Sequence, residues 1–176
     1  MRTMSPDTSV LLLVDYQAKL MPAIDHGAAA AANARRLLGA AHLLKVPTLI
    51  TEQTAAKLGA TVDDLASTQP VLHKTTFDSC RAEGFAAILP PQPHVVVGGC
   101  EAHVCVLQTV LGLLDRGRYV YVVQDAVGSR TAENKEAALR RMERHGAEIV
   151  TTEMVVFEWL GSSEHPRFRE ALALVK

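Results

Sequence analysis

The sequence has little of several features that mark specialised classes of protein. Aromatic residues make up only 5% of the 176 residues, so the core must be built mainly from Val, Leu, Ile and Ala. Uninterrupted apolar runs such as Val10–Val14 and Phe85–Leu89 are five residues long, whereas a membrane span needs roughly 20. We therefore expect no transmembrane helix and a core of aliphatic side chains.

An excess of charge of either sign is also lacking. Lys and Arg total 18 and Asp and Glu total 19, which gives a formal net charge of −1. A near-balanced chain has no electrostatic footprint for nucleic acid or an anionic membrane. Because 48% of the residues are hydrophobic and 21% are charged, the chain is expected to be globular rather than disordered. The expected partner is a small-molecule substrate.

Cysteine is scarce as well. Cys80, Cys100 and Cys105 are an odd number and too few for a disulfide framework. The first ten residues lack the apolar stretch of a signal peptide. We therefore expect a cytoplasmic protein with at least one free thiol, which either packs in the core or acts as a nucleophile.

The chain shows no internal repeat and no Gly/Ser linker, which predicts a single domain over residues 1–176. Short aliphatic runs without polar alternation are typical of strands buried on both faces of a parallel sheet. The candidate strands are Val10–Val14, Thr48–Thr51, Val71–Leu72, Val95–Val97, Tyr119–Val123 and Glu148–Val150. Candidate helices span about 28–45, 81–88, 103–116 and 132–145, with more helix near the C-terminus. This alternation predicts a three-layer α/β/α fold with right-handed crossovers.

Ligands of such folds bind at the carboxyl ends of the strands. There, Asp15 follows the first strand, Lys74 follows the third, and Cys105 lies in the first turn of the helix after the fourth. A cation and a helix N-terminus both favour the reactive thiolate of cysteine, and a carboxylate can take up and return a proton. The three residues predict a site in which a Cys105 thiolate attacks a carbonyl or similar carbon.

Each of these residues also has a purely structural interpretation. Asp15 could cap a loop, Lys74 could be solvated and Cys105 could be a small core residue. Their convergence at one end of the sheet favours the catalytic interpretation. Gln17, Gln53 and Phe77 follow the same strand ends, and we predict that they contact the substrate, with core or surface packing as the alternative.

Five motifs spread over the chain resemble those of the isochorismatase-like cysteine hydrolases. They are LLLVDYQ (11–17), TEQ (51–53), KTTFDS (74–79), GCEAHVCV (99–106) and DAVGSR (125–130). The resemblance runs from about residue 8 to the C-terminus. It implies a doubly wound, six-stranded parallel sheet, a homo-oligomer, and Asp15, Lys74 and Cys105 as the catalytic residues. It also implies a non-proline cis bond between Cys100 and Glu101, which would bring the amides of Glu101 and Cys105 together as an oxyanion hole.

Departures from the family narrow the expected chemistry. Metal-dependent nicotinamidases carry an Asp-x-His…His cluster after the second strand, but residues 51–57 contain no histidine. We therefore predict no metal and no cofactor. Isochorismatases proper cleave a vinyl ether without a cysteine nucleophile, which disfavours that reaction here. The remaining interpretation is a hydrolase of a small amide, carbamoyl or related C–N substrate. A catalytically silent scaffold, a vinyl ether hydrolase and a redox protein that pairs Cys100 with Cys105 remain as alternatives.

Other polar residues near these motifs are assigned structural roles. His103 is expected to face away from the substrate. Asp125, Ser129 and Arg130 are expected to fix the turn after the fifth strand, and Thr131 is a candidate N-cap. Cys80 and Cys100 are interpreted as packing thiols.

Overall fold

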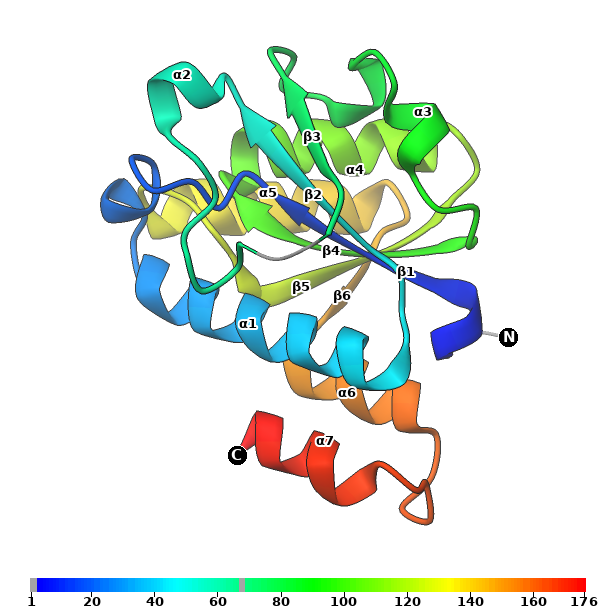
Figure 1. The fold of residues 1–176 in the computed structure, drawn as a ribbon. Helices are drawn as coiled ribbons and strands as arrows, with labels where there is room; N and C mark the ends of the chain where they lie inside the picture. The colour runs from blue at the N-terminus through cyan, green and yellow to red at the C-terminus, as the bar shows by residue number, and fades with distance from the viewer. Residues whose placement is uncertain (1–2, 67–68) are drawn as a thin grey trace.

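The computed structural model describes residues 3–66 and 69–176 and contains a six-stranded sheet in which all neighbouring strands are parallel. The strands are β1 (Ser9–Val14), β2 (Thr48–Gln53), β3 (Val71–Lys74), β4 (His94–Cys100), β5 (Tyr119–Gly128) and β6 (Glu148–Val150). Their order across the sheet is β3-β2-β1-β4-β5-β6 (Figure 1). This confirms the doubly wound sheet. The order reverses between β1 and β4, which is the point where ligands usually bind to such a sheet.

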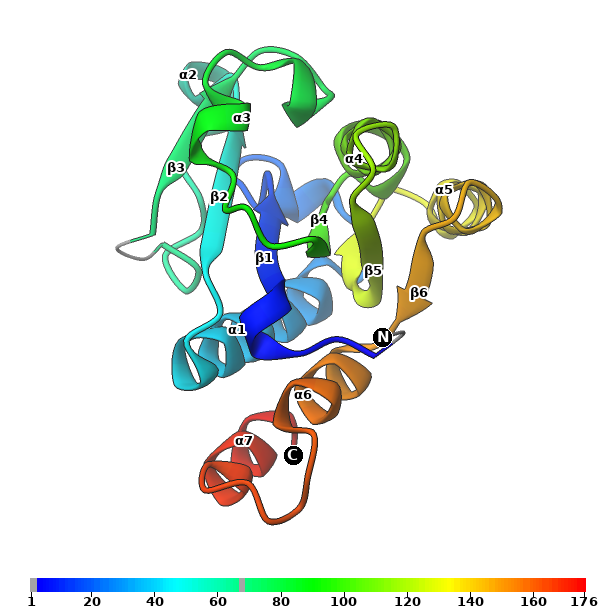
Figure 2. The ribbon, with the colours of Figure 1, turned by 90° about the vertical axis from the view of Figure 1, so that its right-hand side faces the viewer.

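Helices cover both faces of the sheet and complete the three layers (Figure 2). One face carries α1 (Gly27–Leu44) and α6 (Thr152–Leu160), and the other carries α3 (Phe85–Ile88), α4 (Leu107–Leu114) and α5 (Ala132–Arg144). The short α2 (Ala55–Leu58) follows β2, and α7 (Phe168–Val175) packs on α1 and α6. Among the described residues, no helix is both long enough and apolar enough to cross a bilayer.

The unbroken aliphatic runs are explained by the two covered faces. Along β1, Leu11 and Leu13 pack in the core beneath α1 and α6, whereas Val10, Leu12 and Val14 pack in the core beneath α4 and α5. Side chains of a strand alternate between the faces of a sheet. Since both faces of β1 are buried, every position of the strand must be apolar, and no polar alternation remains in the sequence.

Two expected elements differ from the structure at the functional end of the sheet. The helix predicted over residues 103–116 begins with a π-helical turn, Ala102–Val106, before α4. The helix predicted over 81–88 is a 3₁₀ turn, Ser79–Arg81, followed by α3, because Gly84 with φ +80° interrupts it. Turns of the π type are common at functional sites, and this one carries Cys105.

A pair of glycines allows β4 to pass close to β1. A Cβ atom on Gly99 would lie 2.6 Å from both the Cβ and the carbonyl oxygen of Val14, and one on Gly98 would lie 2.8 Å from the Tyr16 hydroxyl. The register of β4 against β5 shifts between Val97 and Gly99, and β5 continues to Gly128, beyond the expected end at Val123. The ends of β1 and β4 are thereby brought together where the site residues emerge.

Candidate active site

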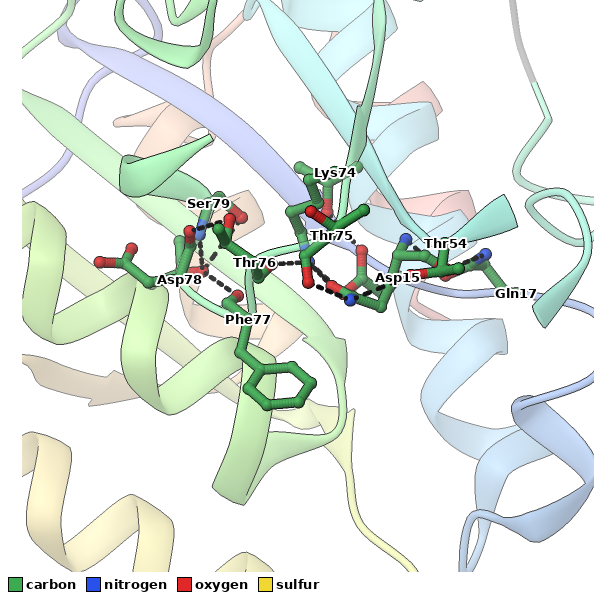
Figure 3. Close-up of polar contacts among 12 residues, drawn as sticks. Asp15, Gln17, Thr54, Lys74, Thr75, Thr76, Phe77, Asp78 and Ser79 are labelled. Atoms are coloured by element: carbon green, nitrogen blue, oxygen red, sulfur yellow. Dashed lines mark hydrogen bonds and ion pairs between the residues drawn. The ribbon is translucent and has the colours of Figure 1, made fainter. Parts of the chain in front are cut away.

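Asp15 is held rigidly at the end of β1. Its backbone is left-handed, with φ 54°, a conformation that Asp tolerates better than most residues. The residue is fully buried. Its Oδ1 accepts a hydrogen bond from Thr51 Oγ1 at 2.7 Å, and its Oδ2 accepts one from Lys74 Nζ at 2.7 Å (Figure 3). Both carboxylate oxygens therefore have a fixed partner.

Lys74, the last residue of β3, is an ion-pair partner and not a solvated lysine. Its Nζ donates to Asp15 Oδ2 at 2.7 Å, to Gln53 Oε1 at 2.9 Å and to the Thr76 carbonyl at 3.3 Å. These three acceptors match the three donors of an ammonium group. The side chains of Lys74 and Asp15 are both 0% exposed, and charges are buried in this way only when they are paired and hydrogen-bonded.

Cys105 lies beside this ion pair and is largely buried. Its residue exposure is 6%. Burial, followed by the negative charge of Asp15, raises the pKa of Cys105 to about 12, although the positive charge of Lys74 acts in the opposite direction. This shift opposes the standing thiolate expected from the sequence, which stays a prediction. Hydrogen bonding to the Asp15 carboxylate contributes to the same raised pKa, which identifies the carboxylate as the nearby acceptor for the thiol proton.

The segment between β4 and Cys105 is fastened to the turn after β5. The Cys100–Glu101 bond is cis, as the resemblance implied. The Glu101 carboxylate pairs with Arg130 Nε at 2.7 Å, and a hydrogen bond of 3.0 Å joins His103 Nδ1 to Ser129 Oγ. Ser129 and Arg130 therefore hold the segment from Glu101 to Cys105.

The neighbouring residues of the β5 turn serve other contacts. Asp125 Oδ1 accepts hydrogen bonds from the backbone N–H and the hydroxyl of Thr152, at the start of α6. Thr131 caps α5 by accepting a hydrogen bond from the Asn134 N–H, as expected.

The two glutamines predicted to contact the substrate make contacts within the protein. Gln17 is fully buried, its Nε2 donates to the carbonyls of Gln53 and Gly59, and its Oε1 accepts from the Gln53 N–H. Gln53 donates from Nε2 to the Thr75 carbonyl and accepts from Lys74 through Oε1. Gln17 thus braces the end of β2 and Gln53 positions Lys74, while a contact of either side chain with substrate stays a prediction.

Phe77 lies on the loop after β3 and is 51% exposed. Its ring points away from Lys74 (Figure 3), so its predicted role as a pocket wall also stays a prediction. A cavity of about 430 Å³ opens beside Lys74. It is lined by Thr54, Ala55, His73, Lys74, Thr75, Thr76, Arg81, Ala82 and Glu83. Cavities of this size accommodate small molecules.

Thr51 is the residue of the centre to which sequence reasoning gave no role. Its hydroxyl donates to Asp15 Oδ1, because Thr51 pairs with Val14 across β1 and β2 and so lies next to Asp15. Its place in the TEQ motif, directly after an aliphatic run, was the available signal.

Of the two remaining thiols, Cys100 lies in a different core from Cys105, whereas Cys80 lies in the same core. Cys100 packs in the core on the α1 side of the sheet and Cys105 in the core on the α4 side, which disfavours the alternative of a Cys100–Cys105 disulfide. Burial raises the pKa values of Cys80 and Cys100 to about 12, which agrees with their interpretation as packing thiols. Within residues 3–66 and 69–176, no three His, Cys, Asp or Glu side chains are grouped as metal ligands.

Comparisons with known proteins agree with these features. The family model of the isochorismatase domain matches residues 9–154. Isochorismatase domain-containing protein 2 of Macaca fascicularis is 40% identical over 97% of this chain and 84% of its own length. Isochorismatase domain-containing protein 1 of Danio rerio is 37% identical over 98% of this chain, which spans only 62% of that protein.

A solved structure described as the MAR1 ribonuclease of Caenorhabditis elegans superposes with a TM-score of 0.94. It is 38% identical, and the match covers 98% of this chain and 92% of that chain. The extent of these matches, together with the doubly wound sheet and the cis bond before Cys105, leads to one assignment. The chain belongs to the isochorismatase family and has its hydrolase-type fold.

Proposed function

We propose that this protein is a cofactor-free cysteine hydrolase that cleaves a small amide, carbamoyl or related C–N substrate. Cys105 would be the nucleophile, Asp15 the proton acceptor and donor, and Lys74 the cation that holds the charge balance of the site. The observation that carries this proposal is the fully buried Lys74–Asp15 ion pair beside the Cys105 thiol. A buried ion pair stabilises a fold poorly compared with apolar packing, so its placement at the end of the sheet favours a chemical role.

The proposed reaction begins when the Cys105 sulfur attacks the carbonyl carbon and its proton passes to Asp15 Oδ. The tetrahedral oxyanion is stabilised by the amides of Glu101 and Cys105, a role assigned from the family resemblance. The C–N bond then breaks and the leaving nitrogen takes the proton from Asp15, which leaves a thioester on Cys105. Water hydrolyses the thioester after it gives a proton to Asp15, and the thiol is restored with release of the acid.

The raised pKa of Cys105 is compatible with this sequence of steps. A thiol with a raised pKa reacts slowly with other electrophiles, and the adjacent carboxylate supplies the base when a substrate arrives. The alternative of a silent scaffold does not explain why three charged or nucleophilic groups share one buried position.

A second candidate function is cleavage of RNA, which is favoured by the 38% identity to the Caenorhabditis elegans protein described as a ribonuclease. The Lys74 ammonium is already bonded to three protein acceptors, and the net charge of −1 provides no general attraction for a polyanion. We therefore place this function below amide hydrolysis.

The test is a panel of small amides, ureido compounds and carbamates with ammonia detection, combined with intact-mass trapping of an acylated protein. Cys105→Ala should lower kcat/KM by at least about a thousandfold, the scale of loss of a catalytic nucleophile. Cys80→Ala is the matched control, because Cys80 is also buried with a pKa of about 12, and it should retain turnover. Full activity of Cys105→Ala, or cleavage of RNA by that variant with no amide turned over by the wild type, contradicts the proposal.

We also propose a cytoplasmic homo-oligomer. Val104, Leu111 and Leu114 form an apolar stripe that is only half-buried, and a second copy would cover it. Light scattering after size exclusion measures the assembly, and Leu111→Glu should shift it towards the monomer.

A further inference from the structure

Residues 101–105 carry the proposed nucleophile and are called the nucleophile segment below. Two contacts join this segment to the turn after β5. Arg130 Nε lies 2.7 Å from Glu101 Oε1, and His103 Nδ1 lies 3.0 Å from Ser129 Oγ. Glu101 and His103 lie between β4 and Cys105, and Ser129 and Arg130 directly follow β5. Both contacts therefore join the nucleophile segment to the first two residues after β5.

The ion pair is unequal in exposure. The Glu101 side chain is only 13% exposed, whereas the Arg130 side chain is 60% exposed. The largely buried carboxylate is held in place through the chain as well, because the Glu101 carbonyl accepts from the N–H groups of Val104 and Val106. After burial and the charge of Asp15, the charge of Glu101 is a smaller cause that raises the pKa of Cys105.

We propose that Arg130 is a positioning residue of this active site, which pairs with Glu101, holds the segment from Glu101 to Cys105 in place and partly neutralises the Glu101 carboxylate. The inference rests on the proposed role of Cys105 as nucleophile. Arg130 acts through its charge, because it offsets the Glu101 carboxylate near a thiol that must become negative during the attack. In a purely structural role, any residue that restrained the segment would serve equally well.

The test uses the alkylation of Cys105 by iodoacetamide, a neutral reagent that is not steered by charge, followed by mass spectrometry across pH 7 to 10. The variants are Arg130→Gln, Arg130→Lys, Glu101→Gln and the double variant. Arg130→Gln should lower the rate by about threefold at each pH, which corresponds to about half a pH unit for an interaction that solvent partly screens. Glu101→Gln should raise it by a similar factor, and Arg130→Lys and the double variant should lie near the wild type.

Two controls separate charge from loosening of the segment. Ser129→Ala removes the contact with His103 without changing any charge and should leave the pH profile unmoved. Arg140→Gln breaks a surface ion pair in α5 whose arginine side chain is 59% exposed, close to that of Arg130, and it should have no effect. Thermal unfolding of each variant checks that the fold is intact, and if Arg130→Gln does not fold, Glu101→Gln and the double variant carry the test.

The outcomes separate this inference from the proposed function. The role of Arg130 is overturned if the Arg130→Gln profile equals that of the wild type. It is also overturned if the double variant is as slow as Arg130→Gln, or if the Ser129→Ala profile shifts as far as the Arg130→Gln profile. Those results leave the loss of turnover in Cys105→Ala untouched. Conversely, turnover by Cys105→Ala removes the catalytic proposal even if the alkylation series follows the expected order.

Discussion

Two side-chain pairs start from neighbouring residues of β3 and differ in their burial. The inner pair joins Lys74 at the end of β3 to Asp15, with both side chains 0% exposed and 2.7 Å between Nζ and Oδ2. The outer pair joins the neighbouring His73 to Glu52 of β2, with 3.2 Å between Nδ1 and Oε2. The His73 side chain is 69% exposed and that of Glu52 is 8% exposed.

Their difference comes from the alternation of the strands and not from the strength of the contact. Lys74 and Gln53 point to the face that carries Cys105, whereas Glu52 bonds to Thr61. Solvent screens an exposed pair and relieves either partner if the other is lost. Water cannot solvate a buried charge that has lost its partner. We therefore expect that only the loss of a partner from the inner pair strongly destabilises the fold.

The largest expected effect contrasts Lys74 of the inner pair with His73 of the outer pair. Lys74→Ala should destabilise the protein by about 3–5 kcal/mol, because it leaves the buried Asp15 carboxylate unpaired. His73→Ala should cost less than about 1 kcal/mol, because His73 is exposed. Urea unfolding measures both. A similar loss of stability in the two variants would contradict the special cost of the buried pair. An Asp15→Asn/Lys74→Met double variant of near-normal stability would support it, because it removes both buried charges together.

The next prediction removes the hydrogen bonds of Gln17, which hold the backbone of Gln53 beside the inner pair. Gln17→Ala should cost about 2–3 kcal/mol, since it leaves buried backbone groups of Gln53 and Gly59 without partners. Gln108→Ala, at an exposed position of α4, is the matched control and should change stability by less than about 0.5 kcal/mol. Denaturant midpoints compare the two, and a Gln17→Ala protein of normal stability but weakened substrate binding would support the substrate contact instead.

A third way to sharpen the comparison uses the thiol that faces the inner pair. Cys105 has a pKa of about 12 in the folded protein against an ordinary 9.0. Between these values the folded state binds more protons than the unfolded state, so stability falls as pH rises. The loss should be up to about 1.4 kcal/mol per pH unit for this thiol. Cys105→Ala should flatten the decline between pH 9 and 11 in urea titrations, and an unchanged slope would show that the thiol is not so perturbed.

The smallest expected effect on stability is at Phe77. Its ring is 51% exposed, so Phe77→Ala should change the free energy of unfolding by less than about 0.5 kcal/mol. If the ring closes over the substrate, KM should rise while stability stays constant. Thermal unfolding and steady-state kinetics on the same preparation separate these readouts, and loss of stability without a change in KM would place Phe77 in the scaffold.

Local sequence patterns were sufficient for most of the architecture. The aliphatic runs placed all six strands, because a strand covered on both faces has no polar positions to obscure it. The end of β5 and the π-helical turn before α4 were missed. Both depend on the close passage of β4 against β1 at Gly98 and Gly99, which involves residues far apart in the chain.

The chemical types of Asp15, Lys74 and Cys105 and their places after strands were determined by the sequence itself, since strand ends of a parallel sheet share one edge. Only the tertiary structure decided that Thr51 and Gln53 hold the ion pair, that Gln17 bonds to the backbone, and that burial and Asp15 raise the pKa of the Cys105 thiol. The physical reason is that protonation and hydrogen bonding depend on burial and on distances of a few ångströms between separate segments, which no local pattern specifies.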